Sequence, residues 1–121
     1  MLLYHNTNKD IDILKPKYFG YNHYTKNDKE CCSIPRLFFY DSRNPKEYHL
    51  EGCSFCYVVD IPKKEIYDLD KDKEKLKGKF DYDIDKILKY IKQNYTGCCY
   101  TTSFVCYCVF KDIKPIKKGI N

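Results

Sequence analysis

Arginine is scarce in this sequence, which narrows the kinds of partner it can bind. Only Arg36 and Arg43 are arginines among its 22 basic residues, and the formal net charge is +5. The lysines are mixed with acidic residues, as in the run 71–75. Proteins that bind nucleic acids more often carry a clustered basic surface with arginines that fork onto phosphates or guanines. The composition therefore argues against nucleic acid as a partner.

Glycine is also scarce, and long apolar runs are lacking. The five glycines are isolated, which excludes the glycine-rich phosphate loop and the Gly-x-Gly-x-x-Gly dinucleotide fingerprint. No apolar run approaches the ~18 residues of a membrane span. Residues 1–10 lack the charged start and the apolar stretch of a signal peptide. We therefore expect a cytoplasmic protein with no membrane partner.

Cysteine, by contrast, is abundant. The eight cysteines form four close pairs: Cys31 and Cys32, Cys53 and Cys56, Cys98 and Cys99, and Cys106 and Cys108. Cys-x2-Cys is half of a common zinc site, but in an extended strand Cys53 and Cys56 point to opposite faces. A reducing cytoplasm disfavours structural disulfides. We expect free thiols buried in the core and no metal, and a redox role is the alternative left open.

The order of the elements predicts an α+β fold in a single domain over residues 1–121. Apolar residues of 83–94 recur at i, i+3, i+4 and i+7, which predicts the main helix there, capped by Asp81 or Asp83. A short helix is expected near 71–77. Strands are predicted at 2–5, 37–40, 54–61, 98–101 and 104–110, in a mixed or antiparallel sheet. The last of these is apolar on both faces, which predicts a central strand.

The first strand places a histidine where a ligand can reach it. The strand at 2–5 ends on His5, and Asn6, Thr7 and Asn8 follow. An imidazole beside small hydrogen-bonding residues at a sheet edge indicates a binding site, although a histidine at a strand end is also often an ordinary surface residue. The pattern alone does not define the chemistry.

These residues resemble the ADP-ribosyltransferase fold. The run 4–7, Tyr-His-Asn-Thr, is similar to the first-strand motif of the H-Y-E branch, which includes poly-ADP-ribose polymerases and small phage anti-CRISPR transferases. The run 36–40 resembles the second strand of that family, and 105–115 resembles its late strand. The resemblance implies an NAD-dependent transferase that modifies a protein or nucleic-acid target. If the chain is phage-encoded, it implies counter-defence in the host cytoplasm against a host protein.

The resemblance also implies roles for particular residues. His5 would bind the ribose of NAD, and the backbone of Asn6 and Thr7 would hold the nicotinamide amide. The family tyrosine of the second strand falls on Phe38, while Tyr40 lies two residues on and faces the same side. Tyr40 and Tyr48 would then cover the nicotinamide ring.

The acid that this family carries late in the chain is lacking. The run 101–104 stands in its place, and Ser103 there offers a hydroxyl that can bind ribose but no negative charge. Such charge often supplies a large share of the rate. Glu47, Glu51 or Asp41 would have to provide it for the domain to catalyse transfer. The alternative is a non-catalytic protein that sequesters a nucleotide signal or docks on a host complex.

Overall fold

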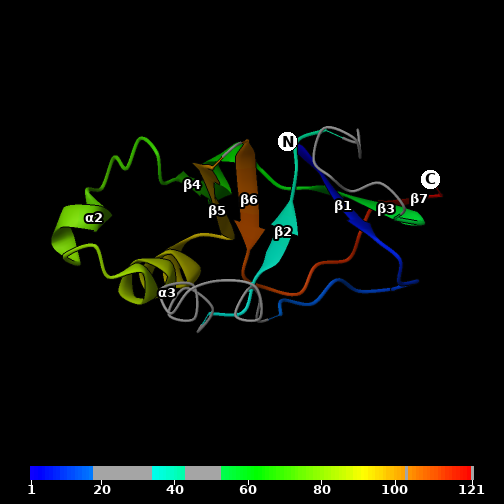
Figure 1. The fold of residues 1–121 in the computed structure, drawn as a ribbon, viewed down its shortest axis with the longest axis horizontal. Helices are drawn as coiled ribbons and strands as arrows, with labels where there is room; N and C mark the ends of the chain where they lie inside the picture. Colours follow the sequence, from blue (N-terminus) through cyan, green and yellow to red (C-terminus); the bar gives the residue numbers. More distant parts are fainter. Residues whose placement is uncertain (18–33, 43–52, 103, 121) are drawn as a thin grey trace.

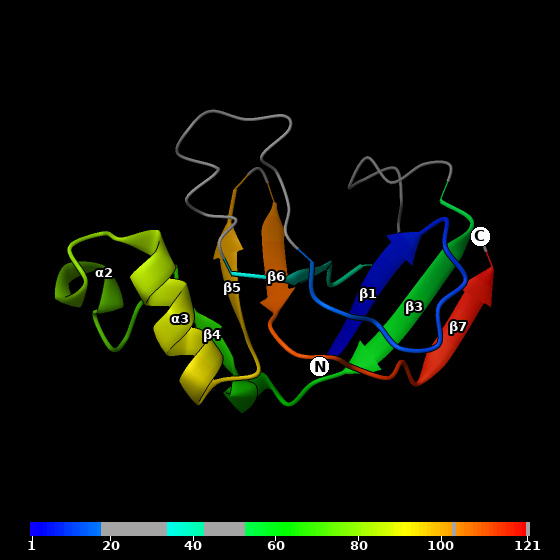
Figure 2. The ribbon, with the colours of Figure 1, turned by 90° about the horizontal axis from the view of Figure 1, so that it is seen from below.

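Two β-sheets lie side by side in the computed structural model, which describes residues 1–17, 34–42, 53–102 and 104–120. A three-stranded sheet has the order β1-β3-β7, and a four-stranded sheet has the order β2-β6-β5-β4. The helices α2 and α3 gather beyond the four-stranded sheet, at the end far from β7 (Figure 1, Figure 2). The α+β class is thus confirmed, whereas the prediction named one sheet and the structure has two.

The three-stranded sheet is antiparallel throughout. It consists of β1 (Leu2–Thr7), β3 (Phe55–Asp60) and β7 (Lys117–Ile120). The prediction that the first strand ends on His5 is wrong, because β3 supplies pairing partners as far as Thr7, which lies opposite Phe55. β7 was not predicted, since two lysines and a glycine among its four residues give no apolar alternation.

The four-stranded sheet is mixed. It contains β2 (Leu37–Phe39), β4 (Ile66–Asp68), β5 (Gly97–Thr101) and β6 (Val105–Val109). β6 pairs antiparallel with β2 and with β5, while β4 runs parallel to β5. The prediction of a central strand over 104–110 is therefore confirmed. β4 was missed because three residues are too short to show a period.

The longest described helix is α3 (Ile84–Asn94), as the apolar spacing predicted. It begins at Asp83, whose side chain accepts a hydrogen bond from the Lys86 amide at 3.3 Å, so the N-cap is Asp83 and not Asp81. Its buried residues Ile87, Leu88 and Ile91 face the four-stranded sheet. In the described ranges no helix is both long and apolar enough to cross a membrane.

The shorter helices follow β3 and β4. They are η1 (Lys63–Glu65) and α2 (Leu76–Lys79). The helix expected near 71–77 begins only at Leu76, because Lys75 has a φ of 56° and so breaks the helical backbone. The carboxylate of Asp72 accepts the amides of Leu76 and Lys77 at 2.9 and 3.0 Å. It thereby satisfies donors that the first turn of a helix leaves without partners.

The four-stranded sheet is buried on both faces. One face packs toward the three-stranded sheet, where Leu3, Phe39 and Val59 are fully buried. The other face packs under α3 and includes Cys98 and Cys108. Cys99 packs against the first core, so Cys98 and Cys99 lie on opposite faces of the sheet.

We expect Gly97→Ala to destabilise the fold by about 1–3 kcal/mol, the usual cost of overpacking a tight site. A Cβ at Gly97 would lie 2.2 Å from the carbonyl oxygen of Cys108, so β5 and β6 would have to move apart. Gly78→Ala is the matched control, because nothing lies within 4 Å of a Cβ at that position in α2. This second change should raise the free energy of unfolding by about 0.5–1 kcal/mol, because alanine replaces a glycine inside a helix. Urea unfolding measures the stability of both variants. Equal unfolding midpoints for the two variants would contradict the close contact between Gly97 and the Cys108 carbonyl.

Candidate functional site

The site lies where β1 and β2 part. These strands meet at one isolated bridge, in which Tyr4 and Tyr40 exchange backbone hydrogen bonds of 2.8 and 2.9 Å. A continued antiparallel ladder would next pair Asn6 with Phe38. The strands instead diverge, and Nδ1 of His5 lies 2.7 Å from the Phe38 carbonyl oxygen. The His5 ring also packs 5.5 Å from the ring of Phe39, measured between centroids.

The contact with Phe38 fixes the protonation of His5. A carbonyl oxygen only accepts hydrogen bonds, so Nδ1 carries the proton and donates it. Burial lowers the pKa of His5, the bond to Phe38 opposes this, and the charge of Lys17 lowers the pKa further. His5 is therefore neutral near pH 7. Its Nε2 is then the acceptor that a ligand can use.

A pocket of about 440 Å³ opens beside His5. Its lining comes from the end of β1, from the segment after it and from the start of β2. The lining residues are His5, Asn6, Thr7, Lys9, Ile11, Ile13, Leu14, Lys15, Lys17 and Leu37. Positive side chains and apolar ones thus share one wall, and no carboxylate lies among the described lining residues.

The segment 9–17 is held in place by contacts with three other parts of the chain. The Tyr57 hydroxyl donates to the Lys9 carbonyl at 3.0 Å and accepts the Ile11 amide at 2.6 Å. Leu14 exchanges backbone hydrogen bonds of 2.9 Å with Ile113. Lys17 exchanges backbone bonds with Arg36 at the start of β2. The segment 9–17 of the pocket lining is therefore held in place although it contains no helix or strand.

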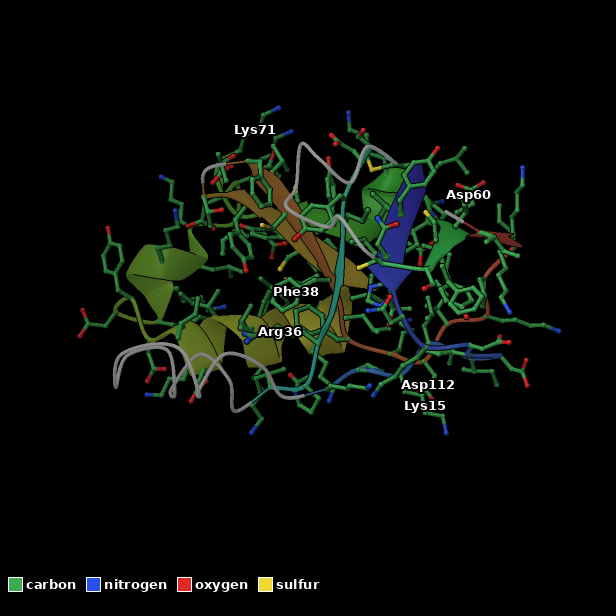
Figure 3. All side chains as sticks on the ribbon, turned by 45° about the vertical axis from the view of Figure 1, so that its right-hand side comes forward. Lys15, Arg36, Phe38, Asp60, Lys71 and Asp112 are labelled. Carbon is green, nitrogen blue, oxygen red and sulfur yellow. The ribbon has the colours of Figure 1, made fainter. Side chains whose placement is uncertain are left out.

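The lysines of this wall form a positive cluster. The ammonium group of Lys9 lies close enough to Lys17 to lower the pKa of Lys17. Lys15 also lines the pocket, and its side chain extends outward from the chain (Figure 3). Two ammonium groups at short range repel each other unless an anion lies between them. The pocket is thus suited electrostatically to an anionic ligand.

The structure brings together three of the predicted site residues, since His5, Asn6 and Thr7 all line the pocket. Phe38 contributes its carbonyl, while its ring lies under the Arg36 guanidinium, 5.5 Å from the ring centre (Figure 3). Tyr40 joins the two sheets through its backbone. Its ring packs edge-on against Phe104 at 5.3 Å.

The other predicted residues, Glu47, Tyr48, Glu51 and Ser103, lie outside the described residues. Sequence reasoning missed Lys9, Lys15 and Lys17. The signal that could have found them is their spacing around the apolar residues of 11–14, directly after the histidine motif.

The cysteines that the structure describes are not grouped as metal ligands. The six in the described ranges are free thiols, but only Cys56, Cys98 and Cys108 are buried, so the expectation of buried cysteines is wrong for Cys53, Cys99 and Cys106. Within those ranges, no three histidine, cysteine or carboxylate side chains gather in a way that could hold a metal ion.

Comparison with known proteins adds no identification. No family model matches the chain, and no curated protein or solved structure matches it. The functional conclusion therefore depends on the pocket and on the sequence motif that lines it.

We expect His5 to make the fold less stable as the pH falls below about 6.5, the unperturbed pKa of histidine. Because the pKa of His5 is lowered in the folded state, the unfolded chain binds the proton more readily. The contribution of neutral His5 is complete above that pH and is lost as the pH falls through the lowered pKa.

The test is urea unfolding of the natural chain and of His5→Asn between pH 7.5 and 5. Asparagine keeps a donor near the Nδ1 position but does not titrate. The natural chain should lose its advantage in free energy of unfolding over His5→Asn as the pH falls, so the difference should shrink or change sign. Parallel pH profiles would show that His5 is not buried as a neutral group.

Proposed function

We propose that the pocket beside His5 binds an anionic nucleotide of the NAD type. The observation that carries this proposal is the convergence of a neutral histidine, a positive cluster and an apolar floor in one pocket. Ligand pockets are commonly about 300–1,000 Å³, mostly apolar, with a few placed polar groups. The volume of about 440 Å³ lies in that range and would take part of a dinucleotide.

Each group has a natural role toward such a ligand. Nε2 of His5 would accept a hydrogen bond from a ribose hydroxyl, as the resemblance to the transferases implies. Lys9 and Lys17 would bind phosphate oxygens, which relieves their mutual repulsion. Ile11 and Leu14 would pack against a base or the nicotinamide ring.

The reaction that the resemblance implies is transfer of ADP-ribose from NAD to a protein or nucleic-acid nucleophile. The bond from C1 of the ribose to the nicotinamide nitrogen breaks, and nicotinamide leaves with the electron pair. A bond from the nucleophile to C1 forms, and the nucleophile loses its proton. This step needs negative charge beside the oxocarbenium ion, for which Glu47 and Glu51 are the nearest candidates in sequence.

A second candidate function is binding without turnover. It is favoured by the lack of a carboxylate among the described residues that line the pocket. Such a protein would sequester a nucleotide signal and leave it intact. The two functions differ in whether nicotinamide is released.

We expect calorimetry to detect binding of NAD, and His5→Ala to weaken it about tenfold or more, the value of one good polar contact. The double variant Lys9→Gln, Lys17→Gln should also weaken binding. Its loss of affinity should be larger at low salt than at high salt, because salt screens the attraction between the lysines and the phosphates. The double variant Lys71→Gln, Lys73→Gln, an equal charge loss at exposed sites between β4 and α2, is the matched control. Unchanged affinity in both pocket variants would remove this pocket from the binding site.

We expect any transfer of labelled ADP-ribose to depend on Glu47 or Glu51. Loss of one preorganised charge costs on the order of 10²–10³ in rate in well-studied enzymes, so Glu47→Gln or Glu51→Gln should reduce transfer at least about tenfold. Asp81→Asn, at an exposed position after α2, is the control. Strong transfer in both glutamine variants would mean that another acid acts. Binding of NAD without transfer supports the second candidate, and no binding refutes the nucleotide proposal.

A further inference from the structure

Two buried cysteines face each other across the four-stranded sheet. Cys98 on β5 and Cys108 on β6 are direct register partners, and they are 0% and 1% exposed. Both belong to the core under α3, so their side chains share one face of the sheet. Opposed residues of an antiparallel pair have Cα atoms about 4.5–5.5 Å apart, which lies within the range of about 4.4–6.8 Å that a disulfide spans.

The surroundings of this pair lower the pKa of Cys108 and raise that of Cys98, so Cys108 is the first of the two to lose its proton. The Cys98 thiol lies directly opposite Cys108 in the ladder, and the Tyr100 hydroxyl lies 3.7 Å from Sγ of Cys108. The buried guanidinium of Arg36 adds a positive charge nearby. Together these groups lower the pKa of Cys108 although burial opposes this. The pair thus has a nucleophilic sulfur next to a second thiol.

The neighbouring cysteines of the same strands are placed differently. Cys99 lies opposite Tyr107, and Cys106 lies opposite Tyr100, so neither faces a second cysteine in the described ladder. Burial raises the pKa of Cys99 to about 11 and also raises that of Cys106. These two cysteines are therefore matched controls on the same pair of strands.

We propose that Cys98 and Cys108 form a redox-active dithiol that hydrogen peroxide converts into an intramolecular disulfide. The Cys108 thiolate attacks one peroxide oxygen, the O–O bond breaks, and the leaving hydroxide takes up a proton to become water. The Cys98 sulfur then attacks the sulfenic sulfur of Cys108 and gives up its proton, and the second oxygen leaves as water. The two thiols lose two electrons to the peroxide, and the products are one disulfide and two waters.

Peroxide can reach this buried pair because it is nearly as small as water. Local opening of strands admits such a molecule without global unfolding. A bulky oxidant such as glutathione disulfide has no such access, so it should react much more slowly. The pair is thereby selective for small oxidants by size.

The experiment treats the reduced full chain with hydrogen peroxide, then alkylates remaining thiols in denaturant and maps the peptides by mass spectrometry. We expect a cross-linked peptide pair that contains Cys98 and Cys108, with the loss of two hydrogen atoms, and reversal by dithiothreitol. Glutathione disulfide at the same concentration should give at least about tenfold less of it over the same time.

The variants Cys98→Ser and Cys108→Ser should abolish the cross-link, whereas Cys99→Ser and Cys106→Ser should retain it. Recovery of alkylated Cys98 and Cys108 after peroxide treatment, while other cysteines are oxidised, would overturn the proposal. A cross-link from either residue to a different cysteine would overturn it as well. The mapping on the unaltered chain needs no variant, so the test holds even where a serine variant fails to fold.

Discussion

The pair of backbone hydrogen bonds between Tyr4 and Tyr40 joins the two sheets and fixes their relative position. The strands β1 and β2 meet there and separate immediately beyond it. Because the strands separate, the Phe38 carbonyl accepts a hydrogen bond from the imidazole of His5. The segment 9–17 fits into the space between the strands and pairs with the chain before β2 at the bridge between Lys17 and Arg36. The pocket therefore forms because the pairing of β1 and β2 stops after Tyr4 and the segment 9–17 covers the space beside it.

Charge within the pocket acts on the histidine and would act on the proposed anion. Burial is the main cause of the lowered pKa of His5, and the positive charge of Lys17 lowers it further. A neutral imidazole with Nδ1 engaged accepts a hydrogen bond at Nε2, which a ribose hydroxyl can donate. The same arrangement would suit a protonated, cationic ligand poorly. The proposed preference for an anion would therefore have two physical sources.

The sequence predicted those parts that local pattern controls. The helix at Ile84–Asn94 followed from its apolar spacing and from Asp83, and the central strand followed from apolar residues on both faces. His5, Asn6 and Thr7 also line one pocket, and their role in binding stays a prediction. For Lys9, Lys15 and Lys17 the sequence offers only their spacing as a signal, because the position of the segment that carries them depends on backbone pairing between Lys17 and Arg36, which are distant in sequence. Short strands such as β4 are also set by their neighbours and not by their own composition.

The bridge at Tyr4 and Tyr40 has a consequence for self-association. It joins the strands into one series, from β7 through β3 and β1 to β2, β6, β5 and β4, so that β7 and β4 are its outermost described strands. Exposed strand edges invite pairing with other chains, and short strands or edge lysines oppose such pairing. β4 is only three residues long, and β7 carries the exposed Lys117 and Lys118. Both ends of the series are thus built to resist the growth of sheets from molecule to molecule at high concentration.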